Sequence, residues 1–145
     1  MSLFYMSLSI CDTDYWKIYL SEDQYCLGRC VIVLKRNCGE LSRLTEEEFF
    51  DLLKIVKRFE VGVKKEFGAN MFNWTCLMNN AWKETNNEIP QVHFHVRPRY
   101  KDKVNFSGVV FEDEVFAHHY KRGTDKKVSE DVAQNIIEKI REIME

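Results

Sequence analysis

The sequence has few of the residues that interrupt a fold, and it has no long apolar run. It contains two prolines and six glycines in 145 residues, without a Pro-, Gly- or Ser-rich linker or an internal repeat. This length and composition predict a single domain over residues 1–145. No apolar segment approaches the roughly 20 residues that cross a bilayer, and the N-terminus lacks the basic segment of a secretory signal. We therefore expect no membrane partner.

Cysteines arranged for disulfide bonds are also missing. The five cysteines are odd in number and do not form closely spaced pairs. A disulfide framework usually needs an even number, so we expect reduced thiols and a cytoplasmic protein. The spacings of Cys26, Cys30 and Cys38 do not match those of zinc ligands, which favours buried packing roles for these thiols.

An excess of charge of one sign is absent as well. The chain has 21 Lys and Arg residues against 23 Asp and Glu residues, a formal net charge of −2. Proteins that coat nucleic acids usually have strongly basic surfaces, so we expect no nucleic-acid partner. The phosphate loop of Walker type, the GxGxxG motif and the GxSxG motif are not found in the sequence. Its function must therefore depend on another combination of residues.

Strand patterns are present in four segments, namely residues 16–21, 30–34, 72–78 and 91–99. Three of them alternate between apolar and polar side chains, as half-buried strands do. Residues 30–34 are apolar throughout, which is typical of a strand covered on both faces. The first two segments are expected to pair as a hairpin.

Helix patterns are present in two segments. Thr45 and Glu48 form a capping box, and apolar residues then recur at helical spacing over about residues 46–67. Ser129 can cap a C-terminal helix over about residues 129–144. Residues 101–128 have no clear pattern. Together these features predict an α+β fold with a mostly antiparallel sheet of about five strands, a long helix and a C-terminal helix.

The segment around Pro98 carries the most informative chemistry. Because strand side chains alternate between faces, one face is expected to point into the core with Val92, Phe94, Val96 and Tyr100. The other face presents a row of polar side chains at roughly 6.6 Å spacing: Gln91, His93, His95, Arg97 and Arg99. Imidazole is a good nucleophile near neutral pH, and guanidinium matches phosphate oxygens with paired donors. Such a face suits attack on phosphorus.

This segment resembles the signature of the histidine triad (HIT) family, His-φ-His-φ-His-φ-φ followed by Pro-Arg. His95 matches the last histidine, His93 the middle one, and Gln91 stands in place of the first. Residues 28–36 resemble the Gly-His-hydrophobic strand of the family, and residues 44–48 resemble the opening of its helix. The resemblance covers about residues 16–100, and within the superfamily it favours the branch that hydrolyses diadenosine polyphosphates.

Family members hydrolyse or transfer nucleotides at the α-phosphate, and the resemblance implies residue roles. His93 would attack the α-phosphorus and become transiently nucleotidylated, while His95 would lie near the phosphates or the leaving-group oxygen. Substrate-binding roles are implied for Gln91, Asn80, Arg97 and Ser21. The resemblance also implies a homodimer and no required cofactor, with a divalent metal only as a counter-ion of the substrate.

The sequence departs from the family pattern at four positions. Gln91 replaces a histidine whose backbone carbonyl orients the nucleophile in the family, and that carbonyl is kept whatever the side chain. Arg97 occupies a usually apolar position, where it can add a phosphate donor. Arg29 replaces a histidine after Gly28. Glu88 stands where relatives have a hydroxyl that assists the leaving group, which leaves the base, the phosphate count and the leaving group open.

Other interpretations of the same residues remain open at this point. His93 and His95 could form a zinc pair, which would need a third ligand such as His118, His119 or a carboxylate. A non-catalytic nucleotide-binding module and a nucleotidyltransferase would use the same face. Basic residues between 97 and 127 are either a solvated surface or a trap for a long polyphosphate. The favoured hypothesis is a hydrolase that acts on a nucleoside polyphosphate or a nucleoside-monophosphate conjugate, with a diadenosine polyphosphate as the first guess.

Overall fold

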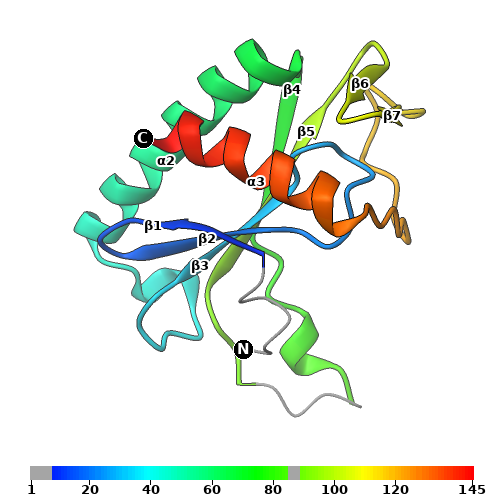
Figure 1. The fold of residues 1–145 in the computed structure, drawn as a ribbon. Coiled ribbons are helices and arrows are strands. Elements are labelled where there is room, and N and C mark those ends of the chain that lie inside the picture. The colour runs from blue at the N-terminus through cyan, green and yellow to red at the C-terminus, as the bar shows by residue number, and fades with distance from the viewer. Residues whose placement is uncertain (1–7, 85–88) are drawn as a thin grey trace.

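A five-stranded antiparallel sheet forms the centre of the molecule in the computed structural model, which describes residues 8–84 and 89–145 (Figure 1). The strands are β1 (Ser9–Asp12), β2 (Trp16–Leu20), β3 (Cys30–Leu34), β4 (Met71–Thr75) and β5 (His93–Arg99). Their spatial order is β1-β2-β3-β5-β4, and every neighbouring pair is antiparallel. The predicted hairpin of β2 and β3 is confirmed, as are the α+β class and the five-stranded sheet.

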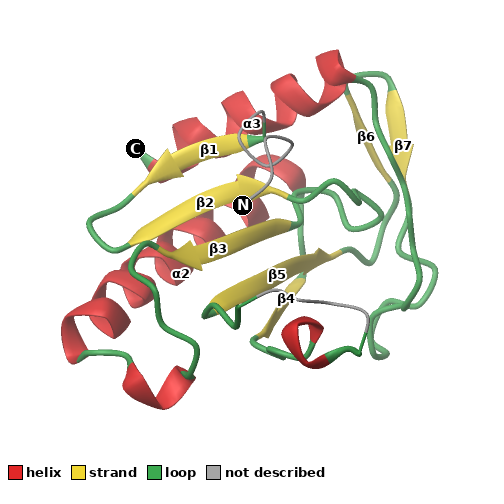
Figure 2. Ribbon diagram, turned by 90° about the horizontal axis from the view of Figure 1, so that it is seen from below, coloured by secondary structure: helices red, strands yellow, loops and turns green. Residues whose placement is uncertain are grey.

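Two helices, α2 (Glu46–Phe67) and α3 (Glu130–Met144), cover one face of this sheet (Figures 1 and 2). Thr45 and Glu48 form the predicted capping box, and Gly68 ends α2 with a φ of 82° in the left-handed region. The two helices pack so closely that a Cβ at Gly62 would lie 2.2 Å from Cγ2 of Ile143. The close approach fixes α3 across the sheet, and both predicted helices are confirmed.

Some element boundaries differ from the expectations. β4 ends at Thr75, and the chain turns soon afterwards at Met78, which has a positive φ of 58°. A non-glycine residue rarely has a positive φ within a strand. The apolar alternation up to Met78 therefore continues past the end of the strand. Strand β1 was not predicted, because its four residues carry too little periodicity to be recognised. Two short 3-10 helices are also present: η1 (Leu41–Arg43) precedes α2, and η2 (Asn80–Trp82) follows β4.

Residues 101–128, which had no clear pattern, contain a small hairpin and a long connection. β6 (Val104–Phe106) pairs with β7 (Val109–Phe111) through Ser107 and Gly108, which both have positive φ. Two positive φ values in a two-residue loop are typical of the turn that suits the twist of a hairpin. After β7 the chain runs along the side of the sheet toward η2 (Figure 2). No helix among residues 8–84 and 89–145 is long and apolar enough to span a membrane.

Candidate functional site

The central position of β5 determines the geometry of the candidate site. β5 lies between β3 and β4, with His95 opposite Val31 on one side and Thr75 on the other. Val92 and Val96 are fully buried, and the ring of Phe94 packs edge-on against Trp16 at 5.9 Å. The predicted inward face of β5 is therefore confirmed. The opposite face carries half-buried His93, His95 and Arg97 in a row.

The ring of His93 is held in one tautomer by the backbone. Its Nδ1 lies 2.8 Å from the carbonyl oxygen of Gln91. A carbonyl oxygen can only accept a hydrogen bond, so Nδ1 is the donor, and in the neutral form of the ring the lone pair is on Nε2. The ring of His95 lies beside it, with the ring centroids 5.2 Å apart and the planes at 79°. The backbone therefore orients the ring of His93 so that Nε2 is the nitrogen left for attack on a substrate.

His95 is held in the opposite tautomer. Nη2 of Arg29 lies 3.4 Å from Nδ1 of His95, and because a guanidinium only donates, Nδ1 must be the acceptor. The proton of the neutral ring is then on Nε2. Burial, Arg29, His93 and Arg97 together lower the pKa of His95 to about 3, so the ring is neutral at physiological pH. One imidazole thus offers a lone pair and its neighbour an N–H donor.

Beyond His95 the same face opens into a cationic pocket, a cavity of about 350 Å³. The charged and aromatic side chains in its lining are Arg29, Arg97, Lys121, Arg122, Asp23 and Tyr120. The guanidinium carbon of Arg97 lies 3.9 Å from the centroid of the Tyr120 ring. Burial and the neighbouring charge of Arg29 lower the pKa of Arg97. The pocket therefore concentrates positive charge next to the two imidazoles.

Asp23 is the carboxylate that organises this pocket. It forms an ion pair with Arg29 at 3.1 Å and accepts hydrogen bonds from the backbone of Lys126 and Tyr25 and from the hydroxyl of Thr124. Burial alone would raise the pKa of Asp23, but the donors from Thr124, Lys126 and Tyr25 and the charge of Arg29 outweigh it and leave the pKa below its usual range. These hydrogen bonds from Thr124 and Lys126 hold the connection between β7 and α3 next to the site.

Arg99 lies on the same face of β5 as His93 but is buried, which corrects the prediction that it belongs to the row of functional side chains. Its side chain is fully buried and forms a bidentate ion pair with Asp113, at 3.1 Å from Nη2 to Oδ1. Its remaining donors reach Asn73 and two backbone carbonyls of the connection after β7. The connection covers this end of the strand, so Arg99 serves the fold.

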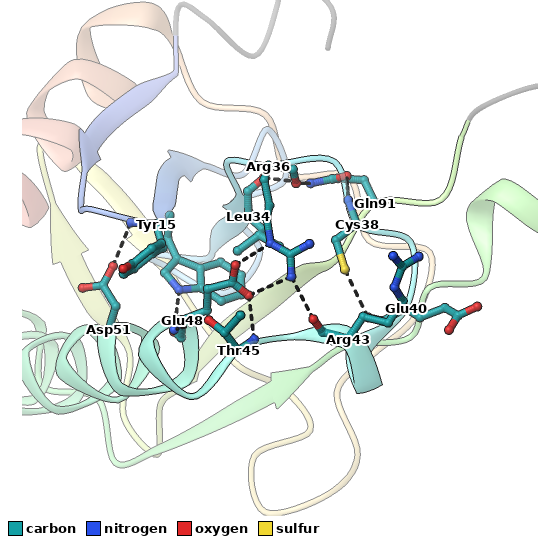
Figure 3. Close-up of polar contacts among 11 residues, drawn as sticks. Tyr15, Leu34, Arg36, Cys38, Glu40, Arg43, Thr45, Glu48, Asp51 and Gln91 are labelled. Carbon is teal, nitrogen blue, oxygen red and sulfur yellow. Dashed lines mark hydrogen bonds and ion pairs between the residues drawn. The ribbon is translucent and has the colours of Figure 1, made fainter.

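The side chain of Gln91 is turned into a loop (Figure 3). Its Nε2 donates to the carbonyls of Leu34 and Arg36, both at 2.8 Å, and its Oε1 accepts from the backbone N–H of Cys38 at 3.0 Å. Both amide hydrogens are therefore used within the protein, because a primary amide has only two. The substrate-binding role of this side chain stays a prediction. What Gln91 contributes to the site is its backbone carbonyl, which holds His93.

The other two predicted substrate contacts are placed beside the cationic pocket rather than in it. Ser21 is buried, and its backbone binds Arg29 and the side chain of Gln24. Asn80 is exposed at the start of η2, while its neighbour Asn79 lines the pocket. Their direct roles toward a substrate stay predictions. Glu88 lies outside the described residues.

The residues invoked by the zinc interpretation do not come together in the described part of the chain. His118 and His119 are both exposed, and Nδ1 of His119 is bonded to the carbonyl of Tyr120. Among the described residues, no group of three or more His, Cys, Asp or Glu side chains is placed to hold a metal ion. Cys26, Cys30 and Cys38 are buried, as their apolar packing predicted.

Several site residues were not identified from the sequence. Lys121 and Arg122 were noted only as members of a basic run, and Arg29 only as a departure from a motif. Asp23 and Tyr120 carry no local signal, because their importance comes from contacts across the fold: Asp23 and Thr124 are 101 positions apart. A motif search has no way to detect such a pair.

Comparison with known proteins identifies the family of this chain. The HIT domain family profile matches residues 7–102. An uncharacterised HIT-like protein of Methanocaldococcus jannaschii is 30% identical over 74 residues, which are 51% of this chain and 54% of that protein. The chain thus spans about half the length of this curated relative.

Solved structures give the same fold. A hypothetical histidine triad nucleotide-binding protein of Sulfolobus tokodaii superposes with a TM-score of 0.66 at 17% identity, over 94% of this chain and 83% of that one. The diadenosine triphosphate hydrolase of Plasmodium falciparum superposes with a TM-score of 0.58 at 13% identity, over 95% and 74%. The family match covers well over half of the chain, which therefore belongs to the HIT domain family.

Proposed function

We propose that this member of the HIT family hydrolyses a nucleoside polyphosphate, or a nucleoside-monophosphate conjugate, at its α-phosphate through a nucleotidyl-histidine. The observation that carries this proposal is the 2.8 Å contact from Nδ1 of His93 to the carbonyl oxygen of Gln91. In the neutral ring this contact places the proton on Nδ1 and the lone pair on Nε2, which is what an attacking imidazole requires. The replacement of the first triad histidine by Gln91 keeps this support, because a backbone carbonyl does not depend on the side chain.

In the first step, the lone pair of His93 Nε2 forms a bond to the α-phosphorus. The bond from phosphorus to the leaving-group oxygen breaks, and that oxygen takes the electron pair. His95, neutral and protonated at Nε2, donates a hydrogen bond to the oxygen on which charge develops. Because both histidines belong to one rigid central strand, their spacing is set before a substrate binds.

In the second step, a water oxygen attacks the same phosphorus from solvent. The P–N bond breaks, its electron pair returns to His93 Nε2, and the proton lost by the water passes to solvent. The products are a nucleoside monophosphate and the group that left first. An acceptor other than water in this step would make the protein a transferase. No step requires a resident metal, so we expect EDTA to leave turnover of a metal-free substrate unchanged.

The substrate class follows from the family and from the charge of the site. HIT family membership supports a nucleotide as the small-molecule partner, and one structural neighbour is a diadenosine triphosphate hydrolase. Arg97 lies two residues beyond His95 on the same face, which suits anionic oxygens next to the reacting phosphorus. A diadenosine polyphosphate is therefore the first substrate to test.

We also propose that the protein is a homodimer that pairs through its β4 side. β4 is an edge strand of the sheet, and its five side chains are all partly exposed. The neighbouring helix α2 exposes large apolar side chains, including Phe50 at 63% and Val61 at 69%. An edge strand next to exposed apolar side chains is a surface that proteins commonly cover. Light scattering after size exclusion would give the mass of the particle.

Intact-protein mass spectrometry after brief mixing with a diadenosine polyphosphate tests the reaction. We expect wild type to gain the mass of one adenylate transiently and to release AMP, while H93A does neither. His119 is exposed and lies outside the row, so H119A is the matched control and should behave as wild type. Ligand binding without adduct or product in wild type would instead identify a non-catalytic binding module. An activity lost to chelators would favour the zinc hydrolase.

A further inference from the structure

The positive charge in the cationic pocket exceeds what the protein itself neutralises. Four cationic side chains line the pocket, Arg29, Arg97, Lys121 and Arg122, against the single carboxylate of Asp23. That carboxylate is already engaged by Arg29, by Thr124 and by backbone N–H groups of Tyr25 and Lys126. Lys121 has one further ion pair, with exposed Glu114 at 3.5 Å. An exposed pair of this kind contributes little, so the pocket keeps a net positive charge.

Arg29 has an unsatisfied hydrogen-bond donor. Its Nε is the single buried side-chain nitrogen or oxygen atom without a hydrogen-bond partner in the part of the chain that the structure describes. An unpartnered buried donor of a charged group is costly, and folded proteins rarely retain one without a reason. Arg29 and half-buried Arg97 both line the cationic pocket, and the charge of Arg29 lowers the pKa of Arg97. An anion bound in the pocket would offset the repulsion between these two like charges.

The pocket is continuous with the reacting centre. Arg29 touches His95 with Nη2 and Asp23 with Nη1, so one guanidinium joins the imidazole row to the pocket. Along β5, Arg97 follows His95 by two residues, or roughly 6.6 Å, on the same face. A group attached to the phosphorus at His93 and extended past His95 would enter this pocket. The cations are therefore placed for the part of the substrate that leaves.

We propose that the cationic pocket binds the phosphate groups of the substrate beyond the α-phosphate. The protein would then select nucleotides whose leaving group carries two or more phosphates over conjugates whose leaving group carries none. This inference rests on the proposed hydrolysis at His93. It assigns Arg29 and Arg97, the two departures from the family pattern on this face, together with Lys121 and Arg122, to recognition of a phosphate chain.

Two substrates with the same adenylate but different leaving groups test the selection. Diadenosine tetraphosphate releases a triphosphate, and the p-nitrophenyl ester of AMP releases no phosphate. We expect K121Q/R122Q to lower kcat/KM for the tetraphosphate by about tenfold, the usual effect of losing a charge-assisted contact. The ester should be cleaved as by wild type. K101Q/K103Q removes the same charge from two exposed lysines that do not line the pocket, and it serves as the control.

Binding of tripolyphosphate, measured by calorimetry, separates failure of this inference from failure of the proposed function. If no nucleotide is hydrolysed but tripolyphosphate binds wild type and K101Q/K103Q more tightly than K121Q/R122Q, the phosphate pocket stands and the hydrolase proposal fails. If K121Q/R122Q binds tripolyphosphate and cleaves both substrates as wild type does, the pocket proposal is overturned. Equal affinity for inorganic phosphate and tripolyphosphate would also overturn it, because the site would then hold one phosphate and no chain.

Discussion

The two halves of strand β5 carry similar side chains on the same face and use them differently. Arg97 and Arg99 are two residues apart, and both point away from the helices. Arg99 is fully buried and paired with Asp113, with its other donors on Asn73 and backbone carbonyls. Arg97 lies over Tyr120 and makes a long contact, 3.4 Å, to the hydroxyl of Thr75. One arginine holds the fold, and the other keeps charge available.

The difference comes from what the connection after β7 brings to each half. It places the carboxylate of Asp113 against Arg99, but cationic Lys121 and Arg122 near Arg97. A buried charge with a matched counter-charge is satisfied and structural, whereas clustered like charges are costly unless a ligand compensates them. Counter-charge and burial, rather than residue type, therefore separate a functional arginine from a structural one here.

Replacement of His93 should give the largest effect, on activity and not on stability. H93A removes the proposed nucleophile, so we expect adenylate release to fall by at least about a thousandfold. The ring is half-buried and its Nδ1 is hydrogen-bonded to a backbone carbonyl, so chemical denaturation should show a nearly unchanged midpoint. Turnover by H93A at a rate near that of wild type would remove His93 from the mechanism.

Replacement of Arg99 should have the opposite outcome, with a large loss of stability. R99M leaves the buried carboxylate of Asp113 without its partner, which typically costs about 3–5 kcal/mol. The double variant R99M/D113L should lose less than R99M alone, because no charge is then left unpaired. Denaturant unfolding of both variants measures this, and an R99M midpoint equal to wild type would contradict the structural role.

Replacing Gln91 by the histidine of the family pattern should lower the stability of the protein. Q91H loses the amide that joins Leu34, Arg36 and Cys38, so we expect a loss of about 1–3 kcal/mol in the free energy of unfolding. The backbone carbonyl that holds His93 is kept, so kcat at a temperature where the variant is folded should stay near the wild-type value. A large gain in kcat would mean that the side chain acts on the substrate.

Replacement of Arg97 sharpens the contrast with Arg99. R97M removes a half-buried charge that is repelled by Arg29, so the free energy of unfolding should change by less than about 1 kcal/mol. Its kcat/KM for diadenosine tetraphosphate should nevertheless fall. Side-by-side unfolding curves of R97M and R99M provide the measurement, and equal losses would abolish the distinction between the two arginines.

The pH dependence of stability should carry a gradual signal from His95. Its pKa is about 3 in the folded protein, below the value of about 6.5 for an unperturbed histidine. Between these values the unfolded chain binds more protons, so stability falls as the pH drops from about 6.5 toward 3. This contribution has a slope of at most about 1.4 kcal/mol per pH unit. H95N should unfold with a correspondingly weaker pH dependence, and identical pH profiles would contradict the neutral buried ring.

Local chemistry explains why the elements could be predicted. The capping box at Thr45 and Glu48 and the spacing of apolar residues specify α2, and alternation along 91–99 specifies the inner face of β5. Strand β1 and the hairpin β6–β7 were missed because they are three or four residues long, too short for periodicity to be read. The histidine pair and the family were identifiable because their signal lies within a few neighbouring residues.

The sequence by itself determined the helices, most strands, the family and the row that contains His93 and His95, since each depends on residues near one another in the chain. Only the tertiary structure decided what the row does. The tautomer of His95 depends on Arg29, 66 positions away, and the burial of Arg99 depends on Asp113 in a segment without a pattern. Hydrogen bonding, burial and counter-charge act over a few ångströms in space, whatever the separation in sequence.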